Sequence, residues 1–122
     1  MGGSLARALA GLPDMEVRGW SPKPGERRAA REAEAVVEAP AEMARAVAGA
    51  ELVVRAVPLS ATCDLLPQVA RMVPKAVLTD VASLKAPVQA AARGAGLEER
   101  WVGSHPLAGS AESGFRASRF DL

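Results

Sequence analysis

A single histidine stands in the sequence, at position 105, inside the stretch GSHPLAGSAESG of residues 103–114. An imidazole changes protonation near neutral pH, so it suits the removal of a proton from a hydroxyl group. Pro106 fixes the backbone directly after it, and Gly103, Ala108 and Gly109 leave room for a ligand. A lone histidine can also serve packing or lie at the surface, but this context favours a catalytic base.

The first residues, MGGSLARALA, place two glycines at the start of a helical stretch. A helix that begins with glycines can turn its free N–H groups toward a pyrophosphate, as in dinucleotide-binding units. Two glycines after an initiator methionine can also be simply flexible. The rest of the sequence decides between these interpretations.

Short β-branched runs alternate with alanine-rich helical stretches along the chain, which is typical of an α/β fold with a parallel sheet covered on both faces. We therefore predict a Rossmann-like, doubly wound parallel sheet. A weaker pattern at 34–40 is compatible with a short edge strand. The predicted strands are 15–20, 51–58, 75–81 and 100–104, and the predicted helices are 4–10, 25–33, 41–48, 60–72 and 86–93.

Ligands of such sheets bind outside the carboxyl ends of the strands, and His105 follows one such end. Ser60 is predicted to cap the helix after the second strand, and Pro67 to kink or break that helix. Arg55 interrupts the apolar run LVVRAV, so we expect it to reach the end of the sheet or to find a carboxylate.

Composition excludes several classes of function. A net charge of +1 predicts neither nucleic-acid binding nor binding to a membrane surface. With one cysteine, Cys63, no internal disulfide is possible, and we expect this residue in the core. No apolar run is long enough for a membrane span, and the N-terminus lacks the basic-then-apolar form of a signal peptide, so a cytoplasmic protein is expected. No metal site is expected.

Three further motifs follow in order: VRAVPLSATCDLLP at 54–67, LTDVASLKAPV at 78–88 and VGSHPLAGSAESGF at 102–115. With the opening MGGSLA, they make the chain resemble the nucleotide-binding domain of the prephenate and arogenate dehydrogenase family over all 122 residues. The family's first strand and G-L-G-L precede this methionine, so the resemblance implies that residues 1–122 form a partial domain. The first, central strand and the helical second domain, which builds a homodimer, are then expected to be absent.

The resemblance also implies a reaction: NAD(P)-dependent oxidation of the ring alcohol of prephenate or arogenate, with loss of carbon dioxide, in tyrosine biosynthesis. His105 matches the family's catalytic histidine, and Ser83 a serine near the substrate hydroxyl. Spacing alone also allows Ser83 to cap the helix that begins near Lys85. The expected cofactor-binding residues are Gly2, Gly3, Ser4, Ala56, Val57, Pro58 and Thr62.

The cofactor is NAD or NADP, with a slight preference for NADP. Where an acidic residue would bind the NAD ribose, this chain has Ser21 with Lys23 close by, although loop length could bring Glu26 there instead. We expect the 122 residues alone to be inactive, or nearly so. The alternatives are a non-catalytic domain that binds a nucleotide or a partner, and another Rossmann-type dehydrogenase, which HPLAGS and DVASLK disfavour.

Overall fold

The computed structural model describes residues 1–108 and 112–121. The chain divides into two compact units, which we call the helical unit (residues 1–46 and 108–122) and the sheet unit (residues 47–107). Gly109, which was expected to leave room beside His105, lies outside the described residues.

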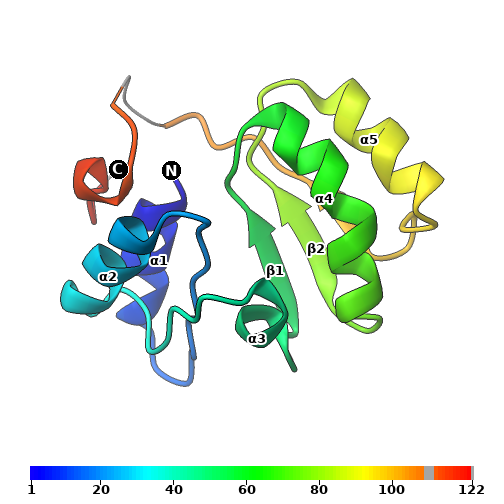
Figure 1. The fold of residues 1–122 in the computed structure, drawn as a ribbon. Coiled ribbons are helices and arrows are strands. Elements are labelled where there is room, and N and C mark those ends of the chain that lie inside the picture. The colour runs from blue at the N-terminus through cyan, green and yellow to red at the C-terminus, as the bar shows by residue number, and fades with distance from the viewer. Residues whose placement is uncertain (109–111, 122) are drawn as a thin grey trace. The chain divides into compact units, whose positions relative to one another are not determined.

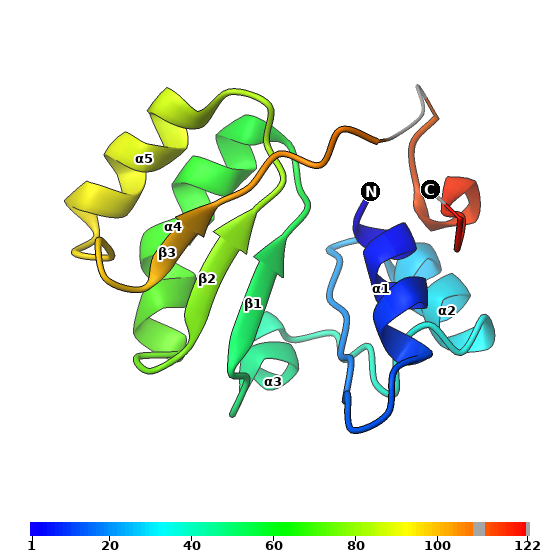
Figure 2. The ribbon, with the colours of Figure 1, turned by 180° about the vertical axis from the view of Figure 1, so that it is seen from behind.

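The sheet unit holds three parallel strands in the order β1-β2-β3: β1 (Leu52–Arg55), β2 (Val77–Asp80) and β3 (Trp101–Gly103). Helices α4 (Leu59–Met72) and α5 (Lys85–Gly94) lie side by side on one face of this sheet (Figure 1). The view from behind shows the opposite face, which no helix of the sheet unit covers (Figure 2). The predicted α/β class with a parallel sheet is confirmed.

Burial separates the two faces of this sheet. Leu78 on β2 is fully buried, and so are Leu66, Val88 and Leu97 from the covering helices and the loop before β3. The neighbouring Val77 and Val102 are 42% and 59% exposed. Because successive side chains of a strand point to opposite faces, the covered face carries the core of this unit.

Helix α4 begins earlier than predicted. Pro58 is its N-cap, and no side chain caps it, so the N-cap prediction for Ser60 is wrong. The first helical turn closes instead through Thr62 N, which donates to Pro58 O at 2.8 Å. The helix also continues through Pro67, so a break at this residue, one of the two predicted alternatives, is wrong, and the kink stays a prediction. Burial of Leu66 and Val69 outweighs the missing N–H of one proline.

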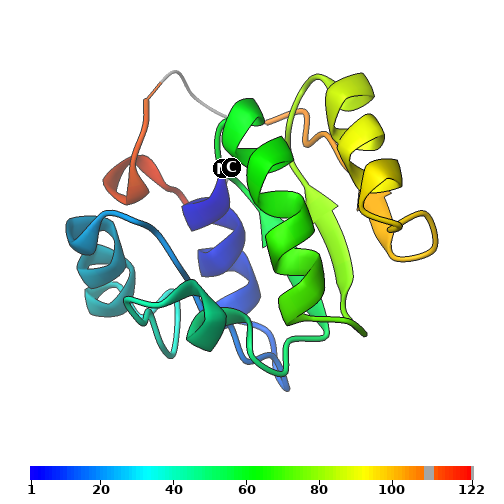
Figure 3. The ribbon, with the colours of Figure 1, turned by 45° about the vertical axis from the view of Figure 1, so that its right-hand side comes forward.

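The helical unit contains α1 (Gly2–Ala10), α2 (Pro24–Glu32) and the short helix η1 (Phe115–Ala117), which packs against both (Figure 3). Helix α3 (Met43–Val47) ends at the division between the units. The small core of the helical unit is built from Ala30, Ala35, Val36 and Phe115, with further alanines and Val17 packed against it.

The strand predicted at 15–20 is wrong in extent, and the weaker pattern at 34–40 does not form a longer strand. They meet only in one isolated parallel bridge between Arg18 and Glu38, held by Gly19 N donating to Glu38 O and Val37 N donating to Val17 O. Two short parallel segments without further strands beside them do not stabilise an extended ladder. Among the described residues, no helix has the length and apolar character needed to cross a membrane.

Candidate functional site

The candidate site lies at the carboxyl edge of the sheet unit. Since β1, β2 and β3 are parallel, the loops 56–58, 81–84 and 104–107 that follow them leave from the same edge. Figure 1 shows the loops after β1 and β2 at the upper end of the sheet. His105 follows β3 and Ser83 follows β2, and both residues are exposed.

Ser83 does not cap the next helix. The N-cap of α5 is Leu84, and no side chain makes a capping hydrogen bond, so the N-cap interpretation of Ser83 is wrong. Within the described part of the chain, neither the Ser83 hydroxyl nor the His105 imidazole has a hydrogen-bond partner. Both groups therefore face solvent at this edge, where a ligand could engage them.

The loop after β1, residues 56–58, is held by a side chain of helix α4. Thr62 is fully buried, and its hydroxyl donates to Val57 O at 3.1 Å. Ala56 and Pro58 are exposed, whereas Val57 is partly buried. Thr62 thus fixes the shape of loop 56–58, and its expected contact with a cofactor stays a prediction.

Arg55, the last residue of β1, meets the first alternative of the sequence-based expectation, because it reaches the end of the sheet. It lies at the end of the sheet, is 5% exposed and stands beside Asp80 in the strand register. Its Nη2 donates to Ala61 O at 2.8 Å in the first turn of α4. Burial lowers the pKa of Arg55 from its ordinary value, while Cys63 and Asp80 nearby act in the opposite direction.

A polar cluster, which we call the edge network, joins the ends of β2 and β3. Lys85 forms an ion pair with the buried carboxylate of Asp80, with Nζ 2.8 Å from Oδ1, and also donates to Ser104 O at 2.5 Å. The Ser104 hydroxyl donates to Asp80 O, and Thr79 Oγ1 donates to Val102 O at 2.6 Å. Sequence analysis identified neither Lys85 nor Ser104, because the contacts join residues far apart in the chain.

The remaining predicted cofactor residues lie in the helical unit. Gly2 and Gly3 open helix α1, as the sequence predicted. A Cβ on Gly3 would lie 2.8 Å from Ser118 Cβ and 2.9 Å from the Phe115 ring, so packing against η1 and its flank already explains this glycine. Ser4 is 5% exposed, and its hydroxyl accepts a hydrogen bond from Arg119 N. Their contacts with a pyrophosphate remain predictions.

The turn before α2 carries the residues expected to select the cofactor. Ser21 Oγ accepts a hydrogen bond from Lys23 N at 3.2 Å, and Ser21 O accepts one from Arg27 Nη1 at 2.5 Å. Glu26 instead accepts a hydrogen bond from Phe115 N, so its carboxylate is engaged within the helical unit. Arg27 is a further cation at this turn, and its position beside Ser21 was not predicted from the sequence.

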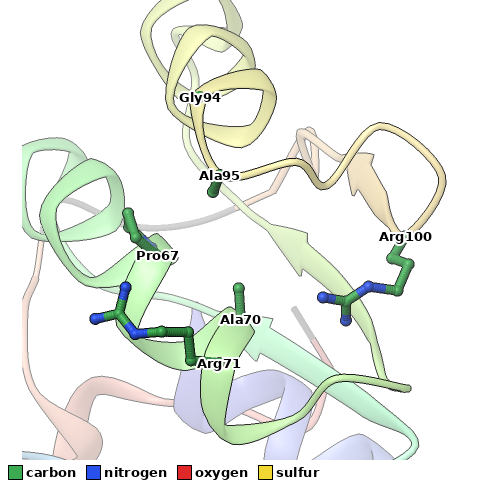
Figure 4. A pocket seen from close by; sticks show the side chains of 6 residues that line it. All are labelled: Pro67, Ala70, Arg71, Gly94, Ala95 and Arg100. Atoms are coloured by element: carbon green, nitrogen blue, oxygen red, sulfur yellow. The ribbon is translucent and has the colours of Figure 1, made fainter.

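A pocket elsewhere in the sheet unit lies at the opposite, amino edge of the sheet (Figure 4). Arg100 precedes β3, and its Nη1 donates to Val73 O at 2.9 Å and to Ala76 O at 2.8 Å. This guanidinium therefore binds the carbonyls before β2. The pocket is lined by Pro67, Ala70, Arg71, Gly94, Ala95 and Arg100. Among the described residues, no group of three potential metal-ligating side chains occurs.

Several known proteins resemble this chain in sequence and in fold. A prephenate dehydrogenase of Lactococcus lactis is 31% identical over 91 residues, which cover 71% of this chain and 26% of that protein. The Synechocystis arogenate dehydrogenase structure is 27% identical with a TM-score of 0.85, covering 97% of this chain and 41% of the other. Prephenate dehydrogenase from Aquifex aeolicus is 25% identical with a TM-score of 0.89, covering 100% of this chain and 45% of the other. The Aquifex enzyme is also known in complex with hydroxyphenyl propionate and NAD+.

The chain thus spans about a quarter of the curated relative and less than half of each solved one. The family model for the nucleotide-binding domain of prephenate dehydrogenase matches residues 5–122. Together with the parallel sheet, this match shows that the chain belongs to the prephenate dehydrogenase family and carries its Rossmann-like nucleotide-binding domain.

Proposed function

We propose that this chain is the cofactor-binding part of an NAD(P)-dependent dehydrogenase that oxidises prephenate or arogenate with loss of carbon dioxide. His105 accepts the proton of the ring hydroxyl, and Ser83 donates a hydrogen bond beside it. When bound, the nicotinamide supplies the hydride acceptor. Loss of carbon dioxide makes the ring aromatic, so one base and correct positioning are sufficient chemistry.

The observation that carries this proposal is the shared edge. His105 and Ser83 follow two neighbouring parallel strands, β3 and β2, and their side chains are exposed there. The carboxyl edge of such a sheet is where ligands of Rossmann-like domains bind.

The residues of the sheet unit fit a dinucleotide at this edge. Helices α4 and α5 both begin here, and neither has a side-chain cap, so their first N–H groups are donors for an anionic or polar group. Arg55 adds cationic character, and its buried Nη1 has no hydrogen-bond partner among the described residues. These donors would bind and orient a phosphorylated cofactor beside loop 56–58.

We further propose that NADP is preferred over NAD. In the turn before α2, Arg27 holds Ser21 O, and Lys23 is exposed. A hydroxyl accompanied by cations suits a 2′-phosphate better than a bare ribose hydroxyl. For the full-length form we propose a homodimer, as the family resemblance implies, and a cytoplasmic location, as the single cysteine and the absence of a signal-peptide pattern in the sequence suggest.

Cofactor titration tests this function. Isothermal calorimetry with NADP+ and NAD+ is expected to show binding of both, with NADP+ the tighter ligand. Lys23→Ala is expected to weaken the binding of NADP+ by about fivefold, which is the scale of one exposed contact between a charge and a phosphate. The same substitution is expected to leave the affinity for NAD+ nearly unchanged. Lys75→Ala, at an exposed lysine outside the carboxyl edge, is the matched control.

Three results would each contradict a different part of this account. Absence of binding by either dinucleotide would remove the assignment as a cofactor-binding domain. Tighter binding of NAD+ than NADP+ would overturn the preference only. Turnover of prephenate by the 122 residues alone would contradict the expectation that this portion is inactive.

A further inference from the structure

We propose that Lys85 is a positioning residue that fixes His105 and Ser83 relative to each other, with the buried carboxylate of Asp80 as its anchor. The inference deepens the proposed function and rests on it only for the catalytic role of His105. The geometry that supports it lies wholly within the sheet unit.

Asp80 supplies the fixed point. It ends β2, its residue exposure is 0%, and its register partner on β1 is Arg55. A buried carboxylate is costly unless it is paired, so its two oxygens demand a cationic partner. Lys85 Nζ contacts both of them. The ammonium group is therefore held at a defined point of the sheet edge.

The same ion pair closes the loop that carries Ser83. Asp80 and Lys85 flank residues 81–84, so their contact joins the end of β2 to the first residue of α5. This closure restricts the conformations that the loop can adopt. Ser83 has no capping role and no partner among the described residues, so the restraint on its position comes from the loop.

Lys85 reaches the other loop through a single carbonyl. Its Nζ donates to Ser104 O, the carbonyl that immediately precedes His105. Its stem also lies against Gly103, where a Cβ would be 3.2 Å from Lys85 Cδ. The peptide that joins Ser104 to His105 is thus held by a charge-assisted hydrogen bond.

Ser104 adds a second tie between the same strands. Its hydroxyl donates to Asp80 O, and its backbone N donates to Asp80 O at 3.3 Å. Thr79 Oγ1 lies 3.2 Å from Ser104 Oγ and completes the cluster. Lys85 therefore contacts the segments on both sides of the site, while touching neither imidazole nor hydroxyl directly.

The test uses the histidine as its own reporter, because the chain has no other imidazole signal. In the 122-residue chain, Lys85→Met is expected to shift the ring proton resonances of His105 and to speed exchange of the Ser104 amide about tenfold, as lost local protection does. Lys75→Met, which removes an exposed lysine at the amino end of β2, is expected to leave both signals unchanged.

Lys85→Met leaves Asp80 without this counter-ion and could fail to fold. The double variant Asp80→Asn with Lys85→Met removes both charges, and it is expected to fold and to show the same His105 shift and faster Ser104 exchange. Lys85→Arg restores a cation and is expected to recover most of the Ser104 protection. Parent-like His105 and Ser104 signals in the folded double variant would overturn the proposal.

Activity gives a separate readout in an active protein that contains this domain. Lys85→Met is expected to lower kcat more strongly than it raises KM, since it misplaces the base without removing a ligand contact. A rise in KM alone would overturn the positioning role. If Lys85→Met shifts the His105 resonances in a chain that binds no dinucleotide, the shift supports the positioning role. The absence of dinucleotide binding then contradicts the proposed function separately.

Discussion

The two units of the chain hold their candidate residues by different means. In the sheet unit, three strands in register bring the ends of separate segments to one edge, and the ion pair of Lys85 with the buried Asp80 joins two of those ends. In the helical unit, the segments 15–20 and 34–40 share one bridge, and contacts with the residues from Phe115 to Arg119 hold α1 and α2. The hydrogen-bonded strands therefore fix the positions of the candidate residues in the sheet unit, and helix packing fixes those in the helical unit.

This contrast has a practical consequence. The chain has two tryptophans, Trp20 in the helical unit and Trp101 on β3 in the sheet unit. Replacing one of them by phenylalanine leaves a fluorescence probe for the other unit. The stability of each unit can then be followed separately.

The largest expected effect concerns the chemistry assigned to the sheet unit. In an active protein that contains this domain, His105→Asn is expected to lower turnover about 100-fold or more, the usual scale for loss of a general base. Steady-state kinetics measures this effect. An unchanged rate would show that His105 takes no part in the mechanism. It would also contradict the assignment of the carboxyl edge of the sheet as the catalytic site.

The core of the sheet unit is expected to respond next. Leu78 is 0% exposed on β2, so Leu78→Ala is expected to destabilise the unit by about 2–5 kcal/mol, through lost burial and a cavity. The control is Val77→Ala, at the adjacent residue of β2, whose side chain is 42% exposed. This substitution is expected to lower the free energy of unfolding by about 1 kcal/mol or less. Urea unfolding followed at Trp101 measures both. Equal losses would contradict the assignment of a covered and an open face.

The helical unit offers a matched pair of glycines. Gly3→Ala places a methyl group 2.8 Å from Ser118 Cβ, so it is expected to destabilise the unit by about 1–3 kcal/mol despite the better helix propensity of alanine. A methyl group on Gly25 in α2 would meet nothing within 4 Å, so Gly25→Ala is expected to stabilise by about 0.5–1 kcal/mol. Unfolding followed at Trp20 compares them, and stabilisation by both would contradict the packing account.

The smallest effect is expected at the exposed pair of Arg119 and Asp121 in the helical unit. The hydrogen bond from Arg119 lowers the pKa of Asp121 from its ordinary value of 3.8. Any stability from this pair is present above that value and is lost as the pH falls through the lowered pKa. Because both groups are fully exposed, Arg119→Ala is expected to leave the midpoint of urea unfolding at pH 7 unchanged. A clear loss of stability there would contradict this.

Sequence patterns predicted the sheet unit better than the helical unit, for a physical reason. Runs such as LVVR and VLTD form strands because neighbouring strands pair with them and helices cover one face of the sheet. The run at 15–20 was also predicted as a strand, but it forms only one isolated bridge, since strand formation depends on partner strands that a local pattern does not contain.

The site shows the same limit. The positions of His105 and Ser83 after strand ends could be predicted, because topology alone places those ends together. The edge network could not, since the contact of Lys85 with Ser104 joins residues that only the folded sheet brings close. The N-cap predictions for Ser60 and Ser83 were wrong because Pro58 and Leu84 cap their helices without a side-chain hydrogen bond.

The central claim is that the one imidazole of this chain lies where the cofactor binds. The most direct test is to titrate the 122-residue chain with NADP+ while recording the ring proton resonances of His105. The account predicts that these resonances shift in step with saturation of the binding isotherm. Saturable binding of NADP+ with His105 resonances that do not move would contradict it.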